Sequence, residues 1–186
     1  MDIKLKAKLF RWSCVAILTY GSESWILTQK LANQINTFAT TAYRKMLNIN
    51  WSDRVSNERL YELTGQRPLS EIIQQRQLRF IGHSLRRNPT EPINQYALYT
   101  PKENHWLEKG YYQKLHAAGK EEKEVCQLLI CVGFILDGRL SLNEKLQIRE
   151  LQQEGLISLS VDRIKQYQKD FLNGRGIQGL IRTYIA

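Results

Sequence analysis

The stretch from Leu69 to Arg87 constrains the fold most, because its polar and apolar residues repeat with the period of an α-helix. Pro68 and Pro89 flank it, and proline is tolerated just ahead of a first turn but disfavours continuation of a helix. At roughly 100° per residue, one sector collects Arg76, Arg79, His83, Arg86 and Arg87, and the opposite side collects Ile73, Leu78, Phe80, Ile81 and Leu85. We therefore expect one helix with a packed face and a basic face, interrupted by Ile72 in the basic sector.

This basic face has two interpretations, a solvated helix surface or a binding site for a polyanion. The formal net charge of +9 favours an anionic partner but carries no information on the fold. The charge is uneven, since residues 1–100 hold 14 Lys and Arg against 7 Asp and Glu, whereas residues 101–186 hold 13 against 11. A polyanion site is therefore expected in the first half.

The rest of the chain also reads as helices separated by turns. Expected helices cover residues 4–20, a segment capped by Thr28, a short one capped by Ser56 or Asn57, then 120–136, 142–154 with a Ser141/Glu144 capping box, 161–173 capped by Ser160, and 177–185. No strand alternation of useful length and no internal repeat appears. The predicted fold is all-α, with a helical bundle in 1–100 and a second helical group in 101–186.

Composition and cysteine usage favour a globular intracellular protein. Hydrophobic residues make up 42% of the chain, enough for a real core. Cys14, Cys126 and Cys131 show no metal-ligand spacing, and the N-terminus lacks the apolar core of a signal peptide. The apolar run 125–136 is too short to span a bilayer and suits a buried helix. We expect reduced, buried thiols in the nucleus or cytoplasm, with no secretion and no membrane partner.

No constellation of residues points to catalysis. The five Asp residues are never adjacent, and the acidic cluster at 121–124 alternates with lysines as a solvated helix start would. The three histidines share no ligand spacing, and the Gly-x-Gly at 174–176 lacks the lysine and hydroxyl of a phosphate-binding loop. The sequence predicts no metal site, no cofactor and no small-molecule substrate.

Phosphate contacts are the chemistry that the arginines suit. A guanidinium donates in a planar fork and keeps its charge, so a row of arginines gives affinity for a nucleic-acid backbone with little sequence selection. Arg44 and Lys45 are further candidates, although their place near the C-terminal end of the second helix also favours them through the helix dipole.

Three patterns in order resemble the region after the catalytic palm in LINE-type (non-LTR) retrotransposon reverse transcriptases. They are Tyr20-Gly-Ser-Glu-Ser-Trp25, then Arg44-Lys-Met-Leu-Asn-Ile-Asn-Trp-Ser-Asp-Arg54 with Asn57 beyond, and Arg76-Gln-Leu-Arg-Phe-Ile-Gly-His83 with Arg86. Phe80 stands where we would expect Trp, and the basic Gly/Arg/Pro-rich stretch that usually follows is replaced by residues 102–109. The resemblance covers residues 1 to about 100.

The resemblance implies a thumb-like helical region that holds the backbone of an RNA/DNA duplex beside a palm domain. The palm of that family carries a Tyr-x-Asp-Asp metal site, which this sequence lacks, so the expectation is a catalytically incomplete fragment and not an enzyme. The backbone-binding residues would be Arg76, Arg79, His83, Arg86, Arg87, Arg44 and Lys45.

The residues shared with the family also have structural interpretations. We expect Trp25 and Trp51 to anchor a core, Gly21 to allow a turn, Gly82 to allow a close helix contact, and Asp53 to cap a turn.

Two other functions stay open. A helical protein-interaction or scaffold domain would pair the arginines with carboxylates, and pairing with Glu58, Glu62 or Glu71 inside the fold would favour it. The order of residues 142–154, Gly155 and 161–173 also matches a helix-turn-helix DNA reader.

Overall fold

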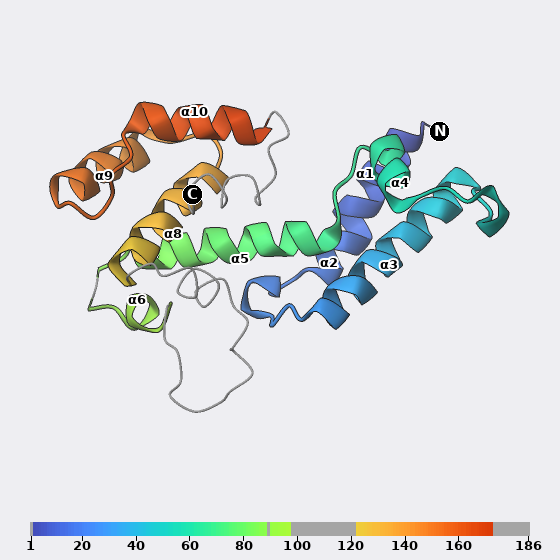
Figure 1. Ribbon diagram of the computed structural model, residues 1–186, viewed down its shortest axis with the longest axis horizontal. Coiled ribbons are helices and arrows are strands. Elements are labelled where there is room, and N and C mark those ends of the chain that lie inside the picture. Colours follow the sequence, from blue (N-terminus) through green and yellow to red (C-terminus); the bar gives the residue numbers. More distant parts are fainter. Residues whose placement is uncertain (1, 89, 98–121, 173–186) are drawn as a thin grey trace. The chain divides into compact units, whose positions relative to one another are not determined.

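The computed structural model describes residues 2–88, 90–97 and 122–172 (Figure 1). Every regular element within these ranges is helical, and none of the described residues forms a strand. The prediction of an all-α fold is therefore confirmed. The expected helix over 177–185 lies outside the described residues.

Two compact units make up the chain, residues 1–76 and residues 77–186, and they divide inside the helix α5 (Leu69–Leu85). The boundary predicted near residue 100 lies outside the described residues and stays a prediction. The first part of α5 belongs to unit 1 and the second part to unit 2, so each unit is described by itself.

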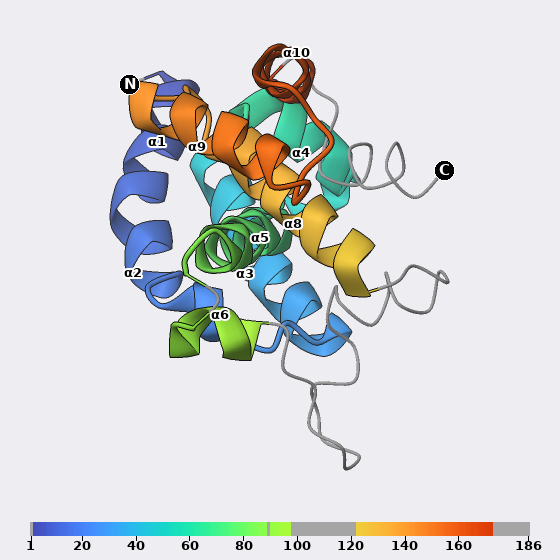
Figure 2. The same cartoon turned by 90° about the vertical axis from the view of Figure 1, so that its left-hand side faces the viewer.

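Unit 1 contains short and long helices around one core. They are α1 (Ile3–Phe10), a π-helical turn (Arg11–Val15), α2 (Ala16–Leu18), a 3₁₀ turn (Ser22–Ser24), α3 (Gln29–Leu47), a second 3₁₀ turn (Trp51–Asp53) and α4 (Asn57–Thr64). Figures 1 and 2 show α1 and α2 running beside α3. The core of unit 1 consists of Val15, Ile35, Ala39, Tyr43, Leu69 and Ile73.

The helix predicted over residues 4–20 forms with a π-helical turn in its middle. Val15 lies eight positions after Ala7, and over eight positions a regular α-helix turns roughly 80° past two full circles. The wider π turn absorbs this excess, so both residues are buried.

Residues close in sequence mark where the helices of unit 1 begin and where they turn, as expected. The Thr28 hydroxyl accepts a hydrogen bond from the amide of Leu31 at 3.2 Å, which caps α3. Of the two candidate caps of α4, Ser56 takes the role. Gly21 adopts φ +65° at the turn after α2, as the turn interpretation requires.

Unit 2 is organised around α8 (Glu122–Leu136), which packs against the second part of α5 and against α10 (Val161–Leu172). Within its described residues, unit 2 also contains α6 (Pro92–Ala97) and α9 (Leu142–Gln153). Figure 2 looks along α5 and shows α8 beside it. The residues from Leu128 to Leu136 are all buried, which confirms the expected buried helix. Among the described residues no helix is long and apolar enough to cross a membrane.

The close approach of α5 to α8 rests on two glycines. A Cβ added to Gly82 would lie 2.6 Å from the Cα of Gly133 and 2.7 Å from the carbonyl oxygen of Leu129. The close helix contact expected at Gly82 is therefore confirmed, and Gly133 is the partner that sequence reasoning missed.

Candidate nucleic-acid interface

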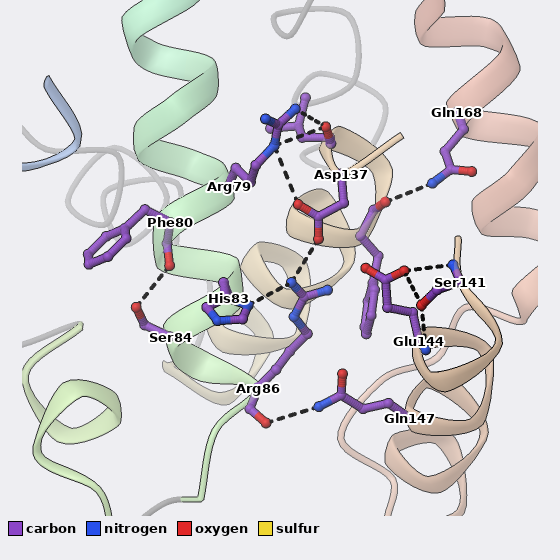
Figure 3. A network of polar contacts seen from close by, with 12 residues as sticks. Arg79, Phe80, His83, Ser84, Arg86, Asp137, Ser141, Glu144, Gln147 and Gln168 are labelled. Atoms are coloured by element: carbon purple, nitrogen blue, oxygen red, sulfur yellow. Dashed lines mark hydrogen bonds and ion pairs between the residues drawn. The ribbon is translucent and has the colours of Figure 1, made fainter. Parts of the chain in front are cut away.

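The predicted helix over Leu69 to Arg87 forms as α5 but ends at Leu85, so Arg86 and Arg87 lie just after it. Most of its expected packed side is buried. Ile73 and Leu78 are fully buried, and Ile81 and Leu85 pack against the unit 2 cores. Phe80 is the exception, because 46% of it is exposed, so its assignment to the packed face was wrong. Phe80 lies two residues before Gly82, roughly 160° around the helix from the point where α8 crosses. Figure 3 shows its ring pointing away from the polar network.

Arg76 is engaged inside unit 1. Its Nη1 donates to the carbonyl oxygen of Thr19 at 2.9 Å and to the Thr19 hydroxyl at 2.8 Å. Thr19 is fully buried at the end of α2. Arg76 therefore ties α5 to the end of α2 and satisfies a carbonyl that the helix terminus leaves open.

Arg79 caps the C-terminal end of α8. Its Nε donates to the carbonyl oxygen of Leu136 at 3.1 Å and lies 3.4 Å from Asp137 Oδ1, and its Nη2 also donates to Leu136. A cation at this helix end is favoured by the exposed carbonyls and the helix dipole. Half of the Arg79 side chain remains accessible to solvent.

Arg86 is inside the protein, with only 5% of its side chain exposed. Its Nη2 donates to Asp137 Oδ2 at 2.8 Å, and the guanidinium carbon lies 4.0 Å from the centroid of the Phe134 ring. His83 Nδ1 lies 3.4 Å from the same Nη2. Asp137 thus joins Arg79 and Arg86 in one network (Figure 3). In this arrangement Arg86 stabilises unit 2 and presents no guanidinium to a ligand.

The capping box predicted for α9 sits next to this network. The Ser141 hydroxyl and amide both donate to Glu144 Oε2 at 2.7 Å. These hydrogen bonds lower the pKa of Glu144, and the charges of Arg86 and His83 add smaller contributions in the same direction.

The remaining candidates lie nearer the surface. Arg87 and Glu91 form an exposed ion pair at 3.4 Å. Arg44 Nη2 donates to the Val55 carbonyl oxygen at 3.0 Å and to Asn57 Oδ1 at 2.9 Å, which holds the chain after α3. Lys45 is exposed on α3.

The predicted sector is therefore divided by packing. Arg76 and Arg86 are engaged within the protein, whereas the side chains of Arg79 and His83 on α5, and of Arg87 two residues after its end, remain at the surface of unit 2. We call Arg79, His83 and Arg87 the exposed basic face.

The arginines contact Thr19 and Asp137 and not the carboxylates proposed from the sequence, and Glu62 pairs with Arg59 at 2.8 Å. Asp137 was read only as part of a turn, although a lone carboxylate directly after an apolar helix was a signal for it.

Asp53 and the two tryptophans Trp25 and Trp51 were expected to have structural roles. Asp53 Oδ2 accepts from the amide of Asn50 at 2.7 Å, so Asp53 caps its turn as predicted. Trp25 packs against the unit 1 core, while the side chain of Trp51 lies outside the described residues.

The thiols differ from the expectation of three buried cysteines. Cys131 is buried, Cys126 is half-buried, and Cys14 is exposed on the π turn. The assignment of Cys14 was wrong, because the π turn directs Val15 and not Cys14 into the core. Among the described residues, no three His, Cys, Asp or Glu side chains are grouped so that they could hold a metal ion.

Comparison of the chain with protein-family models, with curated proteins and with solved structures finds no match.

Proposed function

We propose that this chain is a thumb-like, catalytically incomplete part of a non-LTR retrotransposon reverse transcriptase that binds the backbone of a nucleic acid inside the cell. The exposed basic face is its binding surface. The sequence carries no Tyr-x-Asp-Asp motif, so the role proposed for these 186 residues is to hold a nucleic acid and not to polymerise one.

The observation that carries this proposal is the division of the arginines on and directly after α5 into internal and exposed ones. Arg79 is half exposed and at the same time held by Leu136 and Asp137, so its position is set before a ligand arrives. Arg87 follows two residues after the end of α5 and is half exposed as well. A cation held in place in this way loses little side-chain entropy when it binds a phosphate.

Binding of a fluorescent RNA/DNA hybrid duplex to the full chain over a salt series tests the proposal. We expect affinity to fall as salt rises, because each phosphate contact releases counterions. Arg87→Gln should reduce the slope of log Kd against log salt by about 1. Arg59→Gln is the matched control, since Arg59 is also a half-exposed arginine in a surface ion pair but lies on α4. Undetectable binding at low salt, or binding without salt dependence, would contradict the proposal.

A protein-interaction function is the second candidate, and an apolar stripe along α1 and α2 favours it. Large apolar side chains are exposed at Leu5, Leu9, Trp12, Ile17 and Tyr20, with 86% of Tyr20 accessible. Surface apolar groups in a contiguous set mark interaction sites more often than isolated ones do. The resemblance places a palm domain directly before this region, so the stripe is proposed to contact a palm.

Titration of the full chain with a separately expressed palm domain of a non-LTR reverse transcriptase tests the second candidate. Trp12→Glu should abolish heat release in calorimetry, because a charge would enter an apolar contact. Leu142→Glu on α9 is the control, since Leu142 is an exposed apolar residue of unit 2. Equal binding by the chain and by Trp12→Glu would exclude the stripe as the contact.

A further inference from the structure

Phe80 is an exposed aromatic side chain next to the exposed basic face. It follows Arg79 directly and lies one turn from His83, and on α5 the three side chains share a sector roughly 100° wide. Arg87 follows two residues after the end of the helix. Its backbone is fixed, because the Ser84 hydroxyl donates to the Phe80 carbonyl oxygen at 2.8 Å inside α5. The ring is therefore presented to solvent from a rigid helix.

An exposed ring among cations suits one ligand chemistry, an unpaired nucleotide. Bases of a single strand can stack on an aromatic face while cations hold the phosphates, whereas the base faces of a duplex are covered by neighbouring base pairs. From Arg79 to the end of α5 at Leu85 the helix advances about 9 Å, roughly the rise of two to three stacked nucleotides, and Arg87 follows two residues later. The face is long enough to hold a short single-stranded segment.

We infer that Phe80 and the exposed basic face bind unpaired nucleotides, with a base on the Phe80 ring and phosphates on Arg79 and Arg87. This inference rests on the proposed function and narrows its ligand from nucleic-acid backbone in general to a single-stranded segment. No base edge is read in this arrangement, so binding depends on strandedness and not on sequence.

The test compares single strands with duplex on the full chain. Fluorescein-labelled 12-nucleotide oligo-dT and oligo-rU, and a blunt 12-base-pair hybrid duplex, are titrated at the same salt concentration. We expect the single strands to bind at least about tenfold more tightly than the blunt duplex. Phe80→Ala should weaken single-strand binding about fivefold to a hundredfold, the range of one base–aromatic stack, and Phe80→Trp should retain it.

A matched control separates stacking from general loss of apolar surface. Phe38 on α3 is exposed to almost the same extent, 48%, but lies in unit 1 against Phe10. Phe38→Ala should leave single-strand affinity unchanged, and Phe80→Ala should leave the salt slope unchanged because it removes no charge. Circular dichroism of each variant confirms that the helices are intact.

Failure of the inference is distinguishable from failure of the proposed function. Duplex and single strands bound equally, with no effect of Phe80→Ala but a reduced salt slope in Arg87→Gln, would overturn only the inference. Equal losses in Phe80→Ala and Phe38→Ala would also overturn it. Absence of salt-dependent binding to any of the probes would overturn both.

Discussion

At the scale of single residues, the contact between Gly82 and Gly133 determines how closely α5 and α8 approach. Both neighbours of an added Cβ at Gly82 are backbone atoms, at 2.6 and 2.7 Å, and backbone cannot move aside as a flexible side chain can. Glycine in a helix costs about 1 kcal/mol relative to alanine where nothing else intervenes. The close contact explains why that cost is tolerated here.

Replacement of Gly82 by alanine should therefore destabilise the protein by about 1–3 kcal/mol despite the better helix propensity of alanine. Urea unfolding followed by circular dichroism measures this change. A neutral or stabilising Gly82→Ala would show that the two helices do not cross at this point.

The second residue-scale prediction concerns Asp137, which pairs with the buried Arg86. Asp137→Asn leaves the Arg86 charge inside the protein without its anion, which should lower the free energy of unfolding by about 3–5 kcal/mol. Adding Arg86→Met to this variant removes the buried charge and should restore part of the loss. Glu62→Gln breaks the exposed pair with Arg59 and serves as the control, with an expected change of at most about 1 kcal/mol. Similar losses in Asp137→Asn and Glu62→Gln would contradict the burial of Arg86.

At the scale of elements, α9 depends on its capping box. Ser141 and Glu144 exchange hydrogen bonds with each other's backbone amides, which satisfies donors that the helix start leaves open. Ser141→Ala should cost about 1 kcal/mol in thermal or chemical unfolding at neutral pH.

The same element predicts an acid dependence. The pKa of Glu144 is lower in the folded protein than in the unfolded chain, so its contribution to stability is present above the unfolded pKa and is lost as pH falls through the folded pKa. Glu144→Gln should therefore lose less stability than the wild-type chain between pH 6 and about pH 3. Parallel losses in the two proteins, measured by urea unfolding at each pH, would argue against a charged Glu144 in the cap.

At the scale of the whole molecule, each unit has its own core, and each core contains a group that resists ionisation. Burial, with the nearby Tyr61, raises the pKa of Tyr43 in unit 1 to about 12, and burial raises the pKa of Cys131 in unit 2 to about 12. Both groups contribute stability below their unfolded pKa, about 8.5 for cysteine and about 10 for tyrosine, and lose it as pH rises towards the folded value.

The chain should accordingly become less stable above about pH 8.5, through Cys131 first and through Tyr43 above about pH 10. Cys131→Ala should flatten the first part of this loss and Tyr43→Phe the second. Urea unfolding at several pH values between 8 and 11 checks both. Variants that lose stability along the same curve as the wild-type chain would exclude these two groups as the cause.

Much of the fold follows from signals between residues close in sequence. Thr28, Ser141 and Asp53 cap their helices or turns as predicted, because a cap involves only atoms three residues away. Apolar periodicity located α5 and α9 to within one or two residues. The π turn was not foreseen, since it depends on which side of α1 and α2 the rest of unit 1 covers.

Less of the candidate site could be predicted from the sequence. Helical spacing put five side chains in one sector of α5, and nothing near them in sequence distinguishes Arg86 from Arg87. Their difference comes from Asp137, which lies 51 residues beyond Arg86 and meets it only where α8 ends. Phe80 was misassigned for a different reason: at 100° per residue it falls beside the basic sector and not opposite it, so its exposure agrees with the helical period.

Helix positions, helix ends and the all-α class were thus already set by local pattern, since hydrogen bonds within a helix and at its caps link residues at most a few positions apart. Packing between distant segments decided which arginines are internal and which remain at the surface. Burial and ion pairing arise from contacts across many residues, and a helical period cannot carry that information.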